Sequence, residues 1–169
     1  MGDLVSIFQS ARARRGCIRA TSALDWYERG LALELTDPSA AMSAYRRAIA
    51  GRPDLADAYN NLGRLHHDHN DLADAEALYR LAICAANDVA LYWFNLGVVL
   101  EDLGRSAEAI VSYERALVLD AGLADAHFNL ARQLELVGKA GPIMDELVMR
   151  RAVRHLKRYR DLIRFGATS

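Results

Sequence analysis

A spacing of 34 residues recurs along this chain of 169 residues, and it limits the possible folds more than any other feature. The clearest copies are Asn61-Leu62-Gly63, Asn95-Leu96-Gly97 and Asn129-Leu130-Ala131. A fixed period of this length is typical of small structural units that stack in a row, rather than of a domain with one central core.

Each unit contains two helical patterns joined by a turn. In one unit, Trp93, Leu96 and Leu100 recur at helical spacing before a turn at residues 102–105. The second pattern has the form Ala-x3-Tyr-x2-Ala and begins at Ala41, Ala75 and Ala109. The first unit is one residue shorter, in the turn around Asp37-Pro38. Since neither helix can bury its apolar face alone, the sequence predicts an all-α stack of helix hairpins.

The combined pattern, W-x2-L-G-x2-[LY] followed by A-x3-[YF]-x2-A, resembles the tetratricopeptide repeat (TPR), including TPR modules attached to bacterial MerR-like regulators. The resemblance implies a right-handed superhelical stack of antiparallel hairpins (a TPR solenoid). It covers residues 23–136, about two-thirds of the chain. The expected units are 23–55, 56–89, 90–123 and a degenerate fourth unit at 124–165.

Both ends of the chain depart from the repeat. Residues 1–22 form a basic segment, which is either a short helix or a tail. At the other end we expect a long capping helix over residues 143–164, with Pro142 at its start and a basic outer face. Its predicted buried stripe comprises Met144, Val148, Ala152, Leu156, Tyr159 and Ile163.

Charge is distributed unevenly along the chain, although the net charge is only −1. Residues 1–22 carry a charge of +3, residues 23–137 carry −9, and residues 138–169 carry +5. The acidic middle could attract a basic partner or the basic ends. It disfavours nucleic acid as a ligand.

The resemblance also implies where a ligand binds, because the first helix of each hairpin lines the concave face of such stacks. Five positions of that helix contact peptides in similar repeats. On this basis the candidate peptide-binding groove consists of Tyr27, Asn60, Asn61, Arg64, Phe94, Asn95, Glu101, Phe128, Asn129, Arg132 and Glu135.

Two groups of these residues have distinct expected roles. Asn61, Asn95 and Asn129 form a ladder whose amides can donate to and accept from the backbone of an extended peptide. Phe94 and Phe128 are the expected affinity anchors, exposed in the groove. The alternative is that the C-terminal helix folds back and covers both rings.

Other kinds of site find little support in the sequence. Asn61 is the only match to the residue set with which some TPR proteins clamp chaperone C-termini, since Leu91 stands where a lysine is needed. His66 and His69 have a spacing that metal sites use, but no further ligand cluster is evident and we expect no metal. The chain has no phosphate-binding glycine loop and no hydrolase or metalloprotease motif, so we expect neither an enzyme nor a cofactor. Cys84 is expected to be a small buried apolar residue.

The sequence therefore predicts an adaptor that binds a peptide or partner protein, without a small-molecule substrate. Two alternatives remain: a chaperone for a secreted client, or the partner-binding half of a transcriptional regulatory system. No apolar run approaches the roughly 18 residues of a membrane span. The excess of arginine over lysine is typical of GC-rich bacterial genomes, and we expect a cytoplasmic location. The sequence does not indicate an oligomeric state.

Overall fold

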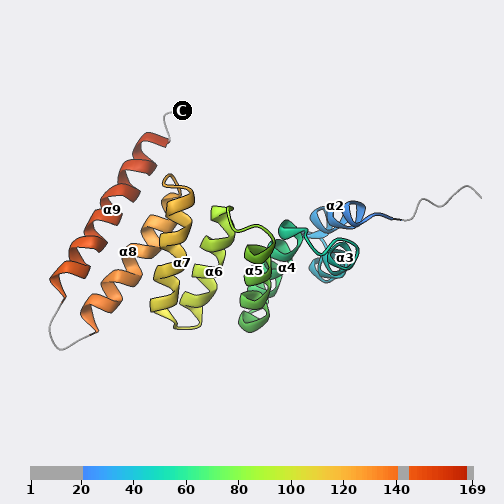
Figure 1. Cartoon of the computed structure of the whole chain (residues 1–169), viewed down its shortest axis with the longest axis horizontal. Helices are drawn as coiled ribbons and strands as arrows, with labels where there is room; N and C mark the ends of the chain where they lie inside the picture. The colour runs from blue at the N-terminus through green and yellow to red at the C-terminus, as the bar shows by residue number, and fades with distance from the viewer. Residues whose placement is uncertain (1–20, 141–144, 167–169) are drawn as a thin grey trace, which may run out of the picture.

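All regular structure described by the computed structural model, which covers residues 21–140 and 145–166, is α-helical. The helices are α2 (Ala23–Leu33), α3 (Pro38–Gly51), α4 (Ala56–Asp68), α5 (Leu72–Ala85), α6 (Ala90–Asp102), α7 (Ser106–Leu119), α8 (Ala124–Lys139) and α9 (Glu146–Gly166). Figure 1 shows them side by side in chain order, with α2 and α9 at opposite ends. The predicted all-α fold class is confirmed.

The helices pack as hairpins, and the hairpins stack. α2 packs on α3, α4 on α5, α6 on α7 and α8 on α9, while the first helix of each hairpin contacts the second helix of the hairpin before it. The first helices also meet one another, since α4 contacts α6 and α6 contacts α8. No comparable contact joins α3 to α5 or α5 to α7 among the described residues. The hairpins therefore fan outwards, and the surface formed by α2, α4, α6 and α8 is the concave one, here called the inner face.

Local sequence explains where the first hairpin begins and turns. Ser22 starts α2 with a capping box, in which its hydroxyl accepts the Asp25 amide at 3.1 Å and the Asp25 carboxylate accepts the Ser22 amide at 2.8 Å. Asp37 caps α3 by accepting the Ala40 amide at 2.9 Å, and Pro38 occupies the first helical turn. The Asp37-Pro38 pair thus ends the turn and starts α3 directly.

The next two hairpins turn differently. Asn70 (φ 63°) and Gly104 (φ 73°) are the described residues with a left-handed backbone, and they occupy the same repeat position after α4 and α6. Glycine and asparagine are the residues that tolerate this conformation best. The first hairpin has one residue fewer in this turn and no left-handed residue, which explains the shift in its repeat period.

A buried tyrosine lies at the centre of each of the first three hairpins. Tyr45, Tyr79 and Tyr113 are 0 %, 1 % and 0 % exposed. Each ring lies against a glycine of the paired helix, at Gly30, Gly63 and Gly97 respectively. The repeated core is therefore built from one large ring set against one missing side chain, which lets the two helices approach closely.

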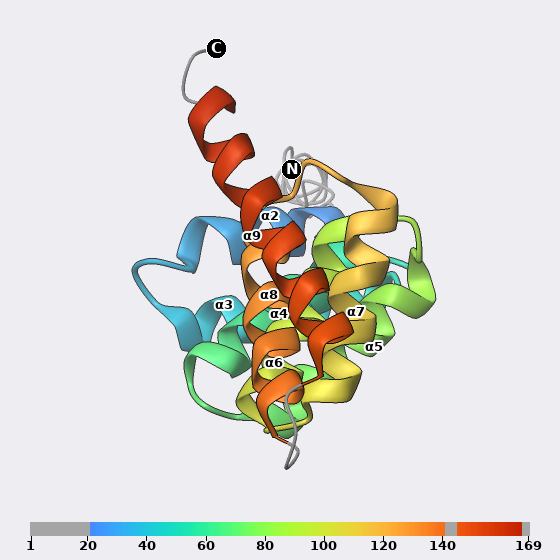
Figure 2. The ribbon, with the colours of Figure 1, turned by 90° about the vertical axis from the view of Figure 1, so that its left-hand side faces the viewer.

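Helix α9 packs along α8 and closes the stack, as the predicted capping helix should (Figures 1 and 2). It spans Glu146–Gly166 rather than 143–164, while Pro142 and Met144 lie outside the described residues. Ala152 is 2 % exposed and joins the core cluster with Val148 beside it. Leu156 and Ile163 do not belong to the buried stripe as predicted, because they are 39 % and 49 % exposed.

Two histidines meet where α9 packs on α8. His127 of α8 and His155 of α9 lie with their Nδ1 atoms 2.8 Å apart, and His127 Nε2 donates to the Ala121 carbonyl at 3.2 Å. Burial lowers the pKa of both rings, that of His155 to about 4. Nearby basic groups lower both pKa values further: His127, Arg151 and Arg154 act on His155, and Arg158 acts on His127.

We therefore expect acid to weaken the packing of α9. A histidine whose pKa is depressed by folding is neutral in the folded chain but charged in the unfolded chain, so stability falls as pH drops from about 6.5 towards 4. Because His155 is only half-buried, the expected loss between pH 7.5 and pH 5.0 is about 1 kcal/mol. Urea unfolding at both pH values measures it, and His155→Gln should remove most of the difference. An equal loss in this variant would contradict the assignment.

Three further expectations concern single features of the chain. Cys84 is exposed on α5, so the prediction that it is buried is wrong. It lies two positions after the buried Ala82. Among the described helices, none combines the length and apolar character that crossing a membrane requires. Of the basic segment at residues 1–22, residues 1–20 lie outside the described part of the chain.

Candidate functional site

Polar contacts between successive first helices show that the predicted groove positions share one face. Asn61 of α4 donates to the Tyr27 hydroxyl of α2 at 3.4 Å, and Asn95 of α6 donates to Asn60 Oδ1 of α4 at 2.8 Å. Arg132 of α8 lies 3.3 Å from Glu101 of α6. The side chains that the sequence assigns to a groove are therefore neighbours on the inner face.

A four-residue polar cluster ties the first hairpin to the second. The Tyr45 hydroxyl donates to Glu34 at 2.5 Å and accepts from Asn61 Nδ2 at 3.5 Å. Arg64 completes the cluster with an ion pair of 2.5 Å to the other oxygen of Glu34. The hydroxyl of a core tyrosine thus reaches the inner face and anchors the side chains of both hairpins there.

The same cluster recurs between the third and fourth hairpins. The Tyr113 hydroxyl donates to Glu101 at 2.9 Å and accepts from Asn129 Nδ2 at 3.4 Å, while Arg132 pairs with Glu101 at 3.3 Å. Burial and the adjacent glutamate raise the pKa of Tyr113 above its usual value, and the same causes act on Tyr45. Both hydroxyls therefore keep their protons and remain hydrogen-bond donors.

The boundary between the second and third hairpins lacks this arrangement. His67 and Val98 stand where the other boundaries have glutamate and arginine, and His67 contacts Asp102 at 2.6 Å. Within the described part of the chain, the Tyr79 hydroxyl makes no such hydrogen bond to a glutamate or an asparagine. Asn95 bonds to the buried Asn60 instead. The central part of the inner face is consequently less crosslinked than its two flanks.

The clusters predict unequal effects of removing a single hydroxyl. Tyr113→Phe should lower the free energy of unfolding by about 1–2 kcal/mol, because hydrogen bonds to charged groups contribute more than neutral ones. Tyr79→Phe should change it by less than about 0.5 kcal/mol. Urea unfolding followed by circular dichroism compares the two variants. Equal losses would show that the Glu101 contact adds nothing.

The two predicted phenylalanine anchors have different surroundings. Phe94 is partly buried, packs against the core and lies 5.9 Å from the Tyr113 ring, so the expectation of an exposed anchor is wrong for it. Phe128 is 38 % exposed, and its ring lies 5.2 Å from that of Tyr159 on α9. The C-terminal helix thus touches one anchor without covering it. Leu91, at 48 %, is the more exposed apolar side chain on α6.

The asparagine ladder is present but partly occupied by internal bonds. Asn61, Asn95 and Asn129 are all half-buried, and each uses its amide nitrogen to donate to a neighbouring side chain. Asn60 is 4 % exposed and donates to Asn61 Oδ1 at 3.2 Å. Among the described residues, no donor occupies the side-chain oxygens of Asn95 and Asn129, which can accept an N–H group from outside.

The inner face carries more acid than base. Its two arginines are each paired with an inner-face glutamate, and Glu135 is paired with Lys139. Exposed carboxylates remain along it at Glu28, Asp57 and Asp125. The field of this surface is therefore negative.

The polar clusters are the part of the site that sequence reasoning missed. The signal was available, because Glu34, Tyr45, Asn61 and Arg64 reappear two repeats later as Glu101, Tyr113, Asn129 and Arg132. A tyrosine ring can be buried while its hydroxyl reaches the inner face, so a core position and a role on this face are compatible.

The histidines at the end of α4 have separate partners. His66 is 8 % exposed and packs between hairpins, with its Nε2 accepting from Arg46 at 3.2 Å. His69 turns back to the Leu65 carbonyl at 2.7 Å. No group of three potential ligands gathers within the described residues.

Comparison with known proteins extends the likeness across the chain. Two family models, both described as tetratricopeptide repeat, match residues 31–90 and 90–122. A crystal structure of MamA is similar with a TM-score of 0.77 and 18 % identity, covering 100 % of this chain and 99 % of that one. A structure of MamA AMB-1 has 25 % identity and a TM-score of 0.66, covering 83 % of this chain and 78 % of that chain.

A third similar structure contains a ligand. It is the first TPR of Spaghetti (RPAP3) bound to the HSP90 peptide SRMEEVD, with a TM-score of 0.67 and 20 % identity, covering 69 % of this chain and 94 % of that one. No curated protein sequence matches the chain.

Proposed function

Because the chain belongs to the tetratricopeptide-repeat family, we propose that it is a protein-interaction adaptor whose inner face holds an extended segment of a partner protein. The observation that carries the proposal is the row of half-buried asparagines on successive first helices, two of which keep an acceptor oxygen. A cytoplasmic location and the absence of a small-molecule substrate form part of this proposal.

The spacing of these asparagines suits an extended chain. Packed helices lie about 8–10 Å apart, and an extended segment advances about 3.3 Å per residue. Asn95 and Asn129 would therefore accept backbone N–H groups about three residues apart. Such bonds contribute only about 0.5–1.5 kcal/mol each, so affinity must come from apolar contacts at Leu91 and Phe128.

Charge determines which segments suit the face. The RPAP3 repeat binds the acidic peptide SRMEEVD. In the present chain, Arg64 and Arg132 are already paired with inner-face glutamates, and exposed carboxylates lie along the rest of the surface. An acidic segment would meet like charge there. The proposed ligand is therefore neutral or basic.

The test compares two double variants in affinity capture from the source cell, followed by mass spectrometry. Leu91→Ala with Phe128→Ala removes the exposed apolar side chains of the inner face. Val111→Ala with Val118→Ala removes two exposed apolar side chains from α7 on the other side of the stack. Circular dichroism first establishes that both variants are folded like the unaltered chain.

A partner lost only from the inner-face variant supports the proposal. Its binding segment, tested as a peptide, should bind more weakly as salt is raised if it is basic. A partner retained by the inner-face variant and lost from the α7 variant would refute the proposal. So would an acidic binding segment in a partner that only the inner-face variant loses.

A further inference from the structure

The last helix of the stack leaves an apolar strip uncovered. Three apolar residues of α9, here called the outer stripe, lie along one side of the helix at spacings of three, four and three: Val153, Leu156 and, after Arg160, Ile163. Val153 is 62 % exposed, Leu156 39 % and Ile163 49 %. Such spacing is that of a seam against which a second helix packs.

The repeat itself shows what this seam corresponds to. In the third hairpin, Ala109 and Tyr113 are 0 % exposed. The Tyr113 ring lies against Gly97 of α6, and α8, which packs on α7, adds Leu130 and Leu134 to the same core cluster. The fourth hairpin repeats the pattern as Ala152-x3-Leu156, yet Leu156 is exposed. Leu156 therefore occupies, at the end of the stack, the position that α8 helps to cover one hairpin earlier.

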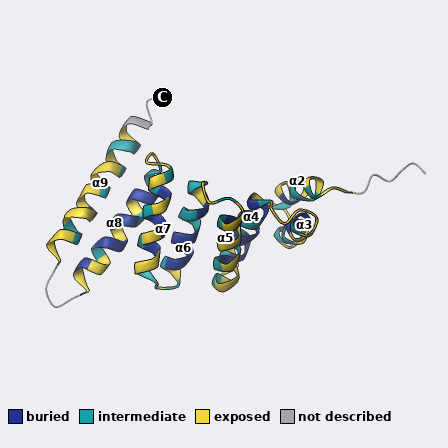
Figure 3. Cartoon of the chain, in the orientation of Figure 1, coloured by how far each residue is buried: buried dark blue, intermediate teal, exposed yellow. Residues whose placement is uncertain are grey.

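The stripe lies on the side of α9 that is turned away from α7. Arg151 points back along the stack, where it pairs with Glu114 of α7. Leu156 lies about 140° further around the helix axis, given 3.6 residues per turn. Figure 2 looks onto this end of the stack and shows α9 in front, and Figure 3 shows how much of α9 is exposed. No described helix lies beyond it.

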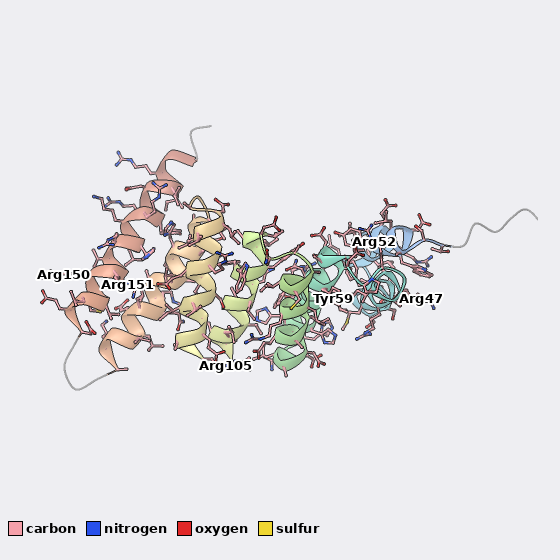
Figure 4. All side chains as sticks on the ribbon, viewed as in Figure 1. Arg47, Arg52, Tyr59, Arg105, Arg150 and Arg151 are labelled. Atoms are coloured by element: carbon pink, nitrogen blue, oxygen red, sulfur yellow. The ribbon has the colours of Figure 1, made fainter. Side chains whose placement is uncertain are left out.

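Strong positive charge surrounds the stripe. Helix α9 carries seven basic residues and two acidic ones. Arg150 and Arg151 lie on it as labelled in Figure 4. Arg154 and Lys157 are exposed and take part in no ion pair among the described residues. A helix that covers the stripe must therefore bring carboxylates to this side.

We propose that the outer stripe of α9 docks an amphipathic helix of a partner protein whose flanks are acidic. The apolar residues of that helix pack onto Val153, Leu156 and Ile163, as α8 packs onto α7 one hairpin earlier. Its carboxylates lie beside Lys157 and Arg160. A second copy of α9 is a poor occupant because it would set two basic rows against each other. This surface is separate from the inner face, so the chain can hold two partners at once.

The test uses the full chain and a synthetic 21-residue helical peptide with leucines at alternating spacings of four and three and glutamates on both flanks. Fluorescence anisotropy of the labelled peptide measures binding. A second peptide carries lysine in place of every glutamate. The stripe variant is Leu156→Ser with Ile163→Ser, and the matched control is Leu147→Ser, because Leu147 is 72 % exposed on another side of α9.

We expect the unaltered chain to bind the glutamate peptide saturably and not to bind the lysine peptide. The stripe variant should bind the glutamate peptide at least tenfold more weakly, whereas the Leu147→Ser control should bind it as the unaltered chain does. Equal binding by the stripe variant and the unaltered chain overturns the proposal, as does failure of the glutamate peptide to bind. Two further results also overturn it. One is a dimer that the stripe variant abolishes, which would make a second copy the occupant. The other is cosedimentation with anionic phosphatidylglycerol vesicles that requires the stripe in the absence of any peptide binding.

Discussion

Gly97→Ala is expected to lower the free energy of unfolding by about 1–3 kcal/mol, although alanine is the better helix former. A Cβ atom at Gly97 would lie 2.5 Å and 2.6 Å from the Cε1 and Cδ1 atoms of Tyr113. The ring cannot move aside cheaply, because it is fully buried and its hydroxyl is bonded to Glu101 on the same helix as Gly97. Urea unfolding followed by circular dichroism at 222 nm (the usual helical signal) measures the loss.

Gly63→Ala is the matched control, and it should change stability by less than about 1 kcal/mol. A Cβ atom at Gly63 would lie 3.0 Å from Tyr79 Cε1, half an ångström further than at Gly97. The difference follows the polar clusters: Tyr45 and Tyr113 are held against their glycines by Glu34 and Glu101, whereas Tyr79 has no such contact. If both variants lose the same stability, the clusters do not set the tightness of the helix contacts.

The second large effect is expected at Ala152. Ala152→Lys places a charge where α9 packs on α8, at a position 2 % exposed and within the core cluster that contains Leu130 and Leu134. An unpaired buried charge costs about 3–5 kcal/mol. The chain can limit this cost by releasing α9, so the expected result is loss of hydrogen-exchange protection over residues 146–166 while α4 to α7 stay protected.

Val153→Lys adds the same side chain one residue later, at a position 62 % exposed. It should leave the exchange pattern of α9 unchanged, since the ammonium group reaches solvent at once. Exchange measured by mass spectrometry distinguishes the two variants. Protection of α9 in Ala152→Lys would mean that the helix does not depend on this contact for its position.

Much of the fold follows from short-range pattern. Helix lengths, hairpin turns and the tyrosine core repeat with the sequence, because each depends on residues within one period or on an identical neighbour. The departure of the first turn was also readable, since one missing residue around Asp37-Pro38 removes the left-handed position that Asn70 and Gly104 occupy later.

The site was less predictable, and Phe94 shows why. Its repeat position indicates a groove residue, but its ring packs against that of Tyr113. One of the two expected anchors is therefore part of the core. Asn60 likewise has a groove position in the repeat, but it is buried and hydrogen-bonded to Asn61 and Asn95. Such outcomes depend on side chains that come together only after stacking.

The sequence by itself determined the period, the all-helical hairpins and the face on which the asparagines lie, because a helix repeats every 3.6 residues wherever it is placed. Only the tertiary structure decided which polar groups pair across hairpins and which apolar residues stay exposed. The physical reason is that burial and pairing depend on neighbours that are distant in sequence. Leu156 follows Ala152 at the same spacing as Tyr113 follows Ala109, but only Tyr113 is followed by a further hairpin that helps to cover it.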